Sequence, residues 1–408
     1  MHPMAGSARP AAVGFIFVTL LLDITGLGII IPVLPQLIQE LTGSDVSQAA
    51  RYGGWLLFAY AFFQFLFAPL VGALSDRYGR RPVLLLSLLG FGLDYIVLAL
   101  APTLAWLFIA RVVSGIFGAS FSTGFAYIAD VSPPEKRAQN FGLVGAAFGL
   151  GFIIGPVSGG LLGEFGPRVP FFVAAALSLL NMAYGYFVLP ESLPVERRRA
   201  FEWKRANPIG ALVALRRYPQ VLGLIGSLVF LYIASHAVQG TWSYFVIEKF
   251  AWSPKDIGLS LGVVGILSAL VQGFLIRKAI PALGAWRTLI FGMVCNVVGL
   301  ILFALVQQQW MLYAFLIPYA LGGLAGPALQ GLLSNGVSES EQGELQGAMS
   351  SMMSATSIVG PVLMTSIFAA FTQEGTGLYF PGAPFVAGAL LSATSLVLIL
   401  GQYRKSKL

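Results

Sequence analysis

The sequence predicts an all-α membrane protein with twelve transmembrane helices in two pseudo-symmetric six-helix bundles. Of the 408 residues, 57% are hydrophobic and only 10% are charged, whereas soluble domains carry about 25% charged residues. Apolar runs long enough to cross a hydrocarbon core of about 30 Å recur along the whole chain. A membrane β-barrel would instead show short segments of alternating hydrophobicity. Because the runs are continuous, we expect helices.

The apolar runs define twelve expected spans. They cover about 13–38, 54–74, 83–101, 104–130, 139–163, 170–189, 220–247, 257–279, 286–306, 310–334, 343–371 and 383–403.

The net charge of +7 is distributed unevenly between the two sides of these spans. With the N-terminus inside, nineteen of the 24 Lys and Arg residues fall on the cytoplasmic side and Arg111 falls within a span. The other four, on the outside, are Arg51, Arg168, Lys249 and Lys255. This bias is the positive-inside signal, so we expect a multi-pass protein of the inner (plasma) membrane with both termini cytoplasmic. The basic residues then need no nucleic-acid partner.

The chain is expected to consist of an N-terminal bundle (1–189), a cytoplasmic linker (190–219) and a C-terminal bundle (220–408). Landmarks repeat between the halves at an offset of 205 residues, which favours duplication over coincidence. They are Gly79 with Gly284, Gly142 with Gly347, and Gly155-Pro156 with Gly360-Pro361. Two six-helix halves joined by a linker are typical of carriers that expose a midplane site to each side in turn.

The loop after the second span reads Gly72-Ala-Leu-Ser-Asp-Arg-Tyr-Gly-Arg-Arg81. Glycines permit a tight turn, and an aspartate can pair with a guanidinium group or cap a helix. The loop is either a charged segment that obeys the positive-inside rule or a gating latch on the cytoplasmic side. The expected gating residues are Gly72, Asp76, Arg77, Gly79, Arg80 and Arg81.

This loop resembles the signature of the major facilitator superfamily. The glycines from Gly145 to Gly160 resemble its antiporter motif, and Arg111-Val-Val-Ser-Gly115 resembles a third motif. Strings such as Leu93-Asp-Tyr95 and Pro327-Ala-Leu-Gln-Gly331 are similar to the tetracycline/proton antiporters within the drug:proton antiporter family. The resemblance covers nearly the whole chain and implies proton-coupled drug export, with a place among antibiotic-resistance and multidrug transporters.

The glycine motif of the fifth span has mechanical properties of its own. Small residues four apart let helix backbones approach closely, and Gly155-Pro156 removes one backbone hydrogen bond and bends the span. The motif serves either ordinary helix packing or gating, and both roles are conformational.

Ionised side chains inside hydrocarbon are costly unless they pair or face a cavity, so each is a candidate functional residue. Asp23 lies about ten residues, or roughly 15 Å, into the first span and has no basic neighbour in sequence. An isolated carboxylate at this depth suits the uptake and release of a proton. The alternative is helix packing through a hidden hydrogen bond.

Asp94 and Arg111 fall at a similar depth in the third and fourth spans, so we expect them to meet. The pair either holds the two spans together or is disturbed by substrate or proton during transport. In the family that the chain resembles, matching carboxylates and an arginine belong to the transport path. We therefore expect Asp23, Asp94 and Arg111 to couple protons.

Neutral polar residues from both halves are expected to line a substrate-binding cavity, although such side chains also bind helices together. They are Gln64, Ser268, Gln272 and Asn296. Ser268 and Asn296 stand where class B tetracycline carriers have a histidine and an aspartate, which puts tetracycline itself in doubt as the substrate. His236, expected near the outer end of the seventh span, is more often structural in such a place.

The sequence therefore favours proton-coupled efflux of an amphipathic small molecule over uptake of a nutrient on the same fold. An intramembrane enzyme is disfavoured because no nucleophile elbow, metal spacing or phosphate loop is found. A fixed channel fits a two-fold repeat with broken helices less well. The expected partners are lipid, small-molecule substrate and protons, for a chain that functions as a monomer. No cofactor is expected, and a divalent cation would enter only as part of the substrate.

Overall fold

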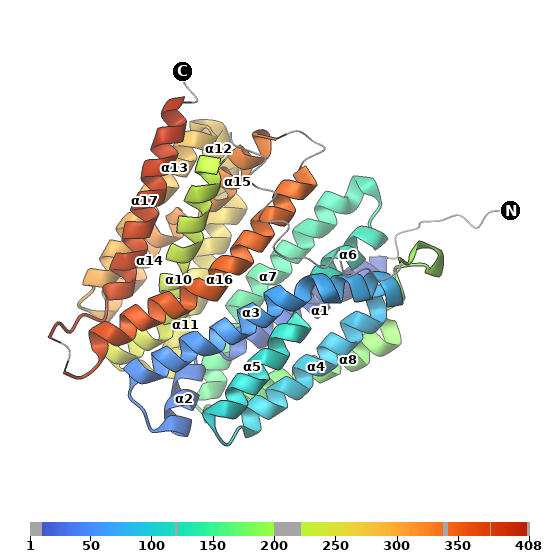
Figure 1. Cartoon of the computed structure of the whole chain (residues 1–408), viewed down its shortest axis with the longest axis horizontal. Helices are drawn as coiled ribbons and strands as arrows, with labels where there is room; N and C mark the ends of the chain where they lie inside the picture. The colour runs from blue at the N-terminus through green and yellow to red at the C-terminus, as the bar shows by residue number, and fades with distance from the viewer. Residues whose placement is uncertain (1–9, 119–120, 200–221, 338–341, 376, 406–408) are drawn as a thin grey trace. The chain divides into compact units, whose positions relative to one another are not determined.

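The computed structural model describes residues 10–118, 121–199, 222–337, 342–375 and 377–405. All regular elements within these ranges are helical, and their course can be followed in Figure 1. The helices before the linker are α1 (Pro10–Ile29), α2 (Leu34–Thr42), α3 (Val46–Tyr78), α4 (Arg80–Leu100), α5 (Leu104–Gly118), α6 (Phe121–Val131), α7 (Pro134–Gly163), α8 (Val169–Val188) and η1 (Val195–Arg197). The helices after it are α10 (Leu222–Phe250), α11 (Pro254–Leu270), η4 (Val271–Leu275), α12 (Ile276–Leu283), α13 (Ala285–Leu305), α14 (Gln309–Gly322), α15 (Ala325–Asn335), α16 (Gln342–Thr372) and α17 (Ala383–Lys405).

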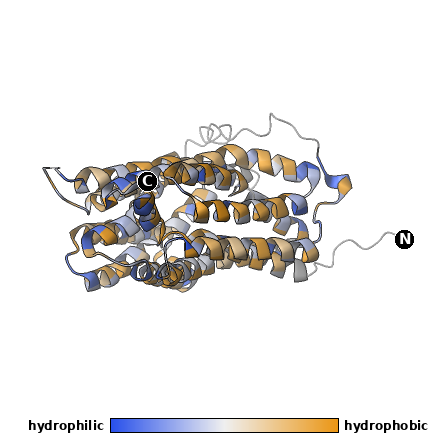
Figure 2. Cartoon of the chain, turned by 90° about the horizontal axis from the view of Figure 1, so that it is seen from below, coloured by the Kyte–Doolittle hydropathy of each residue, from blue (hydrophilic) through white to orange (hydrophobic). Residues whose placement is uncertain are grey.

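The helices confirm the predicted all-α membrane fold. Among the described residues, eleven helices are long and apolar enough to cross a membrane, or twelve when the bent pair of α1 and α2 counts as one span. Figure 2 shows hydrophobic residues along most of each helix. The pair bends by 45° at residues 30–33, where Pro32 lacks the N–H that a continuous helix would use.

The turn between α3 and α4 is shorter than predicted. Helix α3 continues to Tyr78 and α4 begins at Arg80, so Gly79 alone makes the turn, with a φ of 107° that favours glycine. Gly72 lies inside α3, which corrects the expectation that it helps to form the turn. The loop was expected to start where the apolar run of the second span ends. A helix is held by its backbone hydrogen bonds, however, so α3 can continue beyond the hydrocarbon core.

The chain divides into two compact units by spatial contacts. Unit 1 contains Met1–Leu37, Ala59–Pro208 and Pro254–Gly262, and unit 2 contains Ile38–Phe58, Ile209–Ser253 and Val263–Leu408. In unit 1, α1 packs against α7 and α8, and α4 packs against α5 and α8. In unit 2, α10 packs against α16 and α17, and α13 packs against α14 and α17. The division into 1–189 and 220–408 stays a prediction.

The backbone carries the repeat that the glycine landmarks predicted. Helices α4 and α13 both have 21 residues, and the bounds of α13 are those of α4 displaced by 205 residues. Each begins directly after a positive-φ glycine, Gly79 (φ 107°, ψ 160°) and Gly284 (φ 80°, ψ 158°). Two independent matches in length and in an unusual backbone conformation support duplication of a common ancestor helix and turn.

Close packing of α7 against α1 depends on Gly155. A Cβ atom built on Gly155 would lie 2.7 Å from the carbonyl oxygen of Thr25 and 2.8 Å from the Cα of Gly28. The neighbouring Pro156 ring is similarly close to Gly28, and α7 continues as a helix through it. By contrast, a Cβ atom on Gly145 or Gly149 would meet no described atom within 4 Å. The close approach expected of the whole motif is therefore confined to its later glycines.

Unit 2 contains the corresponding packing of α16 against α10. Gly360, the counterpart of Gly155, lies directly against the imidazole ring of His236, and Pro361 lies near Gly240. His236 occupies the middle of α10 rather than its outer end, because α10 extends to Phe250. It is 8% exposed and packs against Gly360, and its structural role stays a prediction.

Gly155→Val would place a branched side chain against the backbone of α1. We expect the free energy of unfolding to fall by about 1–3 kcal/mol, because the added side chain overpacks the contact and forces the backbones of α7 and α1 apart. Thermal unfolding of the purified protein in detergent measures the effect. Gly149→Val, on the same helix with no atom near its Cβ position, is the control. Equal melting temperatures for the two variants would contradict the prediction.

Candidate functional site

Asp94 and Arg111 form a buried ion pair between α4 and α5, as the sequence predicted. The Arg111 Nη2 atom donates to Asp94 Oδ2 at 3.2 Å, and the two side chains are 7% and 0% exposed. Ser114, one helical turn after Arg111 on α5, donates its hydroxyl to the same Oδ2 atom. The other carboxylate oxygen, Asp94 Oδ1, is buried and has no hydrogen-bond partner among the described residues.

Small residues bring the helices of this pair together. Gly90 on α4 lies against the ring of Phe117 on α5, and a Cβ atom there would clash with the ring. Gly115 on α5 lies against the backbone of α3 at Tyr60 and Gln64, where a Cβ atom would clash with the Tyr60 carbonyl oxygen. Glycine at both positions therefore allows α3, α4 and α5 to converge on the buried charges.

Two tyrosines lie near both the ion pair and Asp23, and sequence reasoning missed both as site residues. Tyr60 on α3 and Tyr95 on α4 each lie within electrostatic range of Asp23, Asp94 and Arg111. Tyr95 is 3% exposed, and its hydroxyl lies over Gly26, nearly one turn after Asp23 on α1. Their positions in the sequence could have indicated them. Tyr95 follows Asp94 directly, and Tyr60 precedes Gln64 by four residues, which places both on one helix face.

Asp23 differs from Asp94 in its surroundings. Its side chain is half-buried and makes no hydrogen bond or ion pair with the described residues. Arg111, which lies within electrostatic range of the same two tyrosines, is already bonded to Asp94. Asp23 is therefore a carboxyl group without a fixed counter-ion, which can take up a proton or bind a ligand group. Its role in proton coupling stays a prediction, as do those of Asp94 and Arg111.

Gln64 belongs to the same cluster through Tyr60. Its Nε2 atom donates to the Tyr60 hydroxyl at 3.2 Å and to the carbonyl oxygen of Gly118 at 3.2 Å. The bond to Gly118 holds α3 and α5 together, which is the helix-binding role left open for neutral polar residues, whereas the bond to Tyr60 lies within α3. Its substrate contact stays a prediction.

The other three expected substrate residues lie in unit 2. Asn296 on α13 accepts a hydrogen bond from the Ser392 hydroxyl at 2.8 Å and packs against Gly322. Gln272 is exposed and lies near Gly323, the residue after α14. Ser268 is half-buried on α11. The structure thus brings Asn296 and Gln272 to one end of α14, and substrate binding by the three stays a prediction.

Gln272 also lies in an irregular part of its span. Residues Val271–Leu275 form a single π-helical turn between α11 and α12. Such turns carry one residue more per hydrogen-bonded ring than an α-helix, and they are frequent at functional sites. The residues after this turn, in α12, are therefore rotated relative to Ser268 compared with an uninterrupted α-helix.

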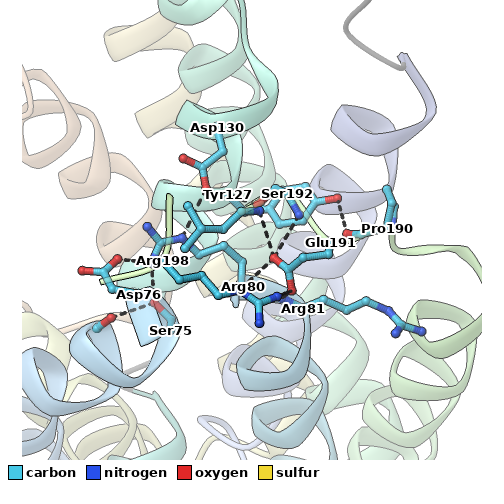
Figure 3. A network of polar contacts seen from close by, with 12 residues as sticks. Ser75, Asp76, Arg80, Arg81, Tyr127, Asp130, Pro190, Glu191, Ser192 and Arg198 are labelled. Carbon is cyan, nitrogen blue, oxygen red and sulfur yellow. Dashed lines mark hydrogen bonds and ion pairs between the residues drawn. The ribbon is translucent and has the colours of Figure 1, made fainter. Parts of the chain in front are cut away.

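The expected gating loop is the centre of a polar network at one end of unit 1, which we call the latch network (Figure 3). Arg80 joins two carboxylates in it. The Arg80 Nη1 atom lies 2.5 Å from Asp76 Oδ1, and Arg80 Nε lies 3.2 Å from Asp130 Oδ2 on α6. The same guanidinium group donates to the Ser75 hydroxyl. Arg80 is only 9% exposed, so these bonds compensate a largely buried charge.

Glu191, which the sequence analysis did not single out, caps α4 from the start of the linker. Its carboxylate accepts the backbone N–H groups of Arg80 at 2.9 Å and of Arg81 at 3.2 Å (Figure 3). It also accepts the N–H groups of Ser192 and Leu193, both at 3.0 Å. A carboxylate at this place satisfies otherwise unbonded N–H groups and interacts favourably with the helix dipole. Asp76 thus pairs with a guanidinium group and Glu191 supplies the cap.

The remaining latch residues have separate roles. Arg81 donates to the carbonyl oxygen of Tyr186 at 2.6 Å and lies over that tyrosine ring, which ties α4 to α8. Arg77 is exposed and lies 5.1 Å from the ring centroid of the adjacent Tyr78. Every latch contact described here lies within unit 1. Gating by the latch, by Gly155 and by Pro156 therefore stays a prediction.

The latch network borders a pocket of about 470 Å³. It is lined by Asp76, Arg80, Asp130, Leu193, Arg197 and Arg199. Carboxylates and guanidinium groups are mixed in this lining, so its charge does not select a ligand of one sign.

Comparison with known proteins agrees with this architecture. Residues 16–361 match the model of the Major Facilitator Superfamily. The chain belongs to this superfamily, whose members are transporters rather than enzymes. Within it, the chain belongs with the tetracycline resistance proteins. It is 43% identical to the class C protein of Escherichia coli over 88% of this chain and 90% of the relative.

The chain is also similar to a second tetracycline resistance protein and to a solved structure. The class B tetracycline resistance protein of Escherichia coli is 35% identical over 85% of this chain and 86% of the relative. The crystal structure of the human organic anion transporter MFSD10 superposes with a TM-score of 0.69 at 23% identity, covering 98% of this chain and 100% of that chain. The structural similarity supports the fold alone.

Arg111→Ala would leave the Asp94 carboxylate buried with Ser114 as its remaining partner. We expect the free energy of unfolding to fall by about 3–5 kcal/mol, the usual consequence of breaking a buried ion pair on one side. Adding Asp94→Asn should restore most of the loss because the uncompensated charge is removed. Thermal unfolding in detergent provides the measurement, with the exposed Lys255→Ala as control. A double variant less stable than Arg111→Ala would refute this account.

Glu191→Ala would remove the cap of α4. We expect a loss of about 0.5–2 kcal/mol in the free energy of unfolding, as for other helix caps. The matched control is Glu196→Ala, an exposed carboxylate five residues further along the linker. If thermal unfolding shows the same melting temperature for both variants, the bonds to Arg80 and Arg81 do not stabilise α4.

Proposed function

We propose that the chain exports an amphipathic small molecule, a tetracycline or a related antibiotic, in exchange for protons. Relatives that cover most of the chain are tetracycline resistance proteins of several classes, and a multidrug resistance protein of Bacillus subtilis is 31% identical over 86% of this chain. These names favour efflux of a drug over uptake of a nutrient.

The observation that carries the proposal is the arrangement of two carboxyl groups in unit 1. Among the residues that the structure describes, Asp94 is paired with Arg111 and keeps one oxygen without a partner, whereas Asp23 has no counter-ion. Asp23 and Asp94 are buried or half-buried acids near the same two tyrosines, and each can bind a proton. An ion pair with a purely structural role would need only one acid.

The proposed cycle uses these acids in turn. With Asp23 or Asp94 deprotonated, the carrier takes substrate from the cytoplasm. Protonation from the outside then displaces the substrate and neutralises the carboxyl group for the return. Because the chain lacks a nucleotide-binding loop motif, we assign the energy to the proton gradient.

The setting of the cycle follows from the family and the charge distribution. We place the protein in the bacterial inner membrane as a monomer, with both termini in the cytoplasm. It needs no cofactor in this scheme, and a divalent cation enters only when the substrate carries it. The bilayer and the substrate are its partners.

Transport in cells and proteoliposomes tests the proposal. Cells that express the protein should accumulate less tetracycline, and a protonophore should abolish the difference. In proteoliposomes, Asp23→Asn and Asp94→Asn should each lower drug transport driven by an imposed pH gradient by at least about tenfold, because each removes a proton site.

Glu374→Gln is the control for these variants, since Glu374 is an exposed carboxylate outside the spans. Higher drug accumulation in expressing cells would show uptake instead of export. Full proton coupling in both aspartate variants would show that other groups carry the proton.

A further inference from the structure

We propose that Ser114 is a positioning residue for proton exchange at Asp94. It holds the carboxyl group in both protonation states and thereby sets the pH range in which the carrier works. This inference rests on the proposed function, because it assumes that Asp94 takes part in coupling. Ser114 lies within the motif Arg111-Val-Val-Ser-Gly115, but the sequence analysis assigned it no role of its own.

The geometry of the carboxylate supports this role. Ser114 and Arg111 are three residues apart on α5, so both side chains reach Asp94 from the same helix face. Both bond to Oδ2, and Oδ1 is buried without a partner among the described residues. Ser114 is 1% exposed and Asp94 is 2% exposed. The hydroxyl is therefore one of two polar groups that the described chain offers to this acid.

A hydroxyl group can do what a guanidinium group cannot. Arginine only donates hydrogen bonds, so it favours the ionised carboxylate. A serine hydroxyl donates to the carboxylate when Asp94 is ionised and can rotate to accept from the acid when Asp94 is protonated. Ser114 thus keeps a bond to Asp94 through both halves of a proton-exchange cycle, while the bond from Arg111 weakens on protonation.

Few other charged or titratable groups face Asp94. Asp23 on α1, Tyr60 on α3 and Tyr95 on α4 itself lie within electrostatic range of the pair. Helices α6 and α8 also pack against α4. Their titratable residues in the described chain bond elsewhere or lie toward the latch end of α4, and they are Tyr127, Asp130, Tyr184 and Tyr186.

Removal of the hydroxyl should change the pH response of the carrier. A hydrogen bond to an ionised group stabilises it more than a bond to a neutral one. In Ser114→Ala, the protonated acid should therefore persist to higher pH. We expect the pH of half-maximal drug transport to rise by about one unit, because a charge-assisted bond of typical strength corresponds to about that shift.

The experiment compares variants in proteoliposomes across a series of pH values. Ser114→Thr keeps the hydroxyl and should retain the wild-type profile, whereas Ser114→Cys, a weak donor of similar size, should shift in the direction of Ser114→Ala. Ser178→Ala is the control. Ser178 is likewise buried and bonds to α4, but its partner is the carbonyl oxygen of Leu88.

A second readout does not depend on transport. The infrared band of the protonated Asp94 carboxyl group, assigned by its loss in Asp94→Asn, should persist to higher pH in Ser114→Ala and Ser114→Cys than in wild type. Unchanged bands and profiles in both variants would overturn the proposal, as would an equal shift in Ser178→Ala. If wild-type transport itself shows no response to the pH gradient, the proposed function fails, while the infrared titration still decides the role of Ser114.

Discussion

The charge of Arg111 inside the bundle of unit 1 requires the carboxylate of Asp94. Either group alone would be buried at a cost of several kcal/mol, so the pair fixes how α4 and α5 meet. Glycines at their contact allow the approach, and Tyr60 and Tyr95 lie within electrostatic range of both the pair and Asp23. The candidate proton sites depend on this arrangement, because Asp23, Tyr60 and Tyr95 lie near the Asp94–Arg111 pair.

Helix α4 relates this buried chemistry to the latch network. It begins at Arg80, where Glu191 bonds its first N–H groups, and carries Asp94 fourteen residues later, roughly 21 Å along the axis. A straight helix transmits a change of position at one end to the other because its backbone hydrogen bonds resist local distortion. The linker start, the latch and the ion pair are thus attached to one rigid element.

The sequence predicted much of this structure where local rules suffice. Hydropathy located the spans, glycine spacing revealed the repeat, and a rise of about 1.5 Å per residue placed Asp94 and Arg111 at one depth. Contacts between distant segments were beyond such rules. Glu191 caps a helix that begins 111 residues earlier, and the motif Arg111-Val-Val-Ser-Gly115 did not reveal that Ser114 bonds to Asp94 on another helix. Likewise, pattern alone gave Gly145 and Gly149 a packing role that their open surroundings do not require.

The π-helical turn at Val271–Leu275 affects the direction in which the following helix faces. A regular α-helix advances about 100° per residue, so the extra residue in this turn rotates all that follows by about that angle relative to an uninterrupted helix. The direction of α12 with respect to Ser268 is therefore fixed by residue count as well as by side-chain chemistry. Deletion of a single residue from this segment would therefore rotate the whole of α12 about the helix axis.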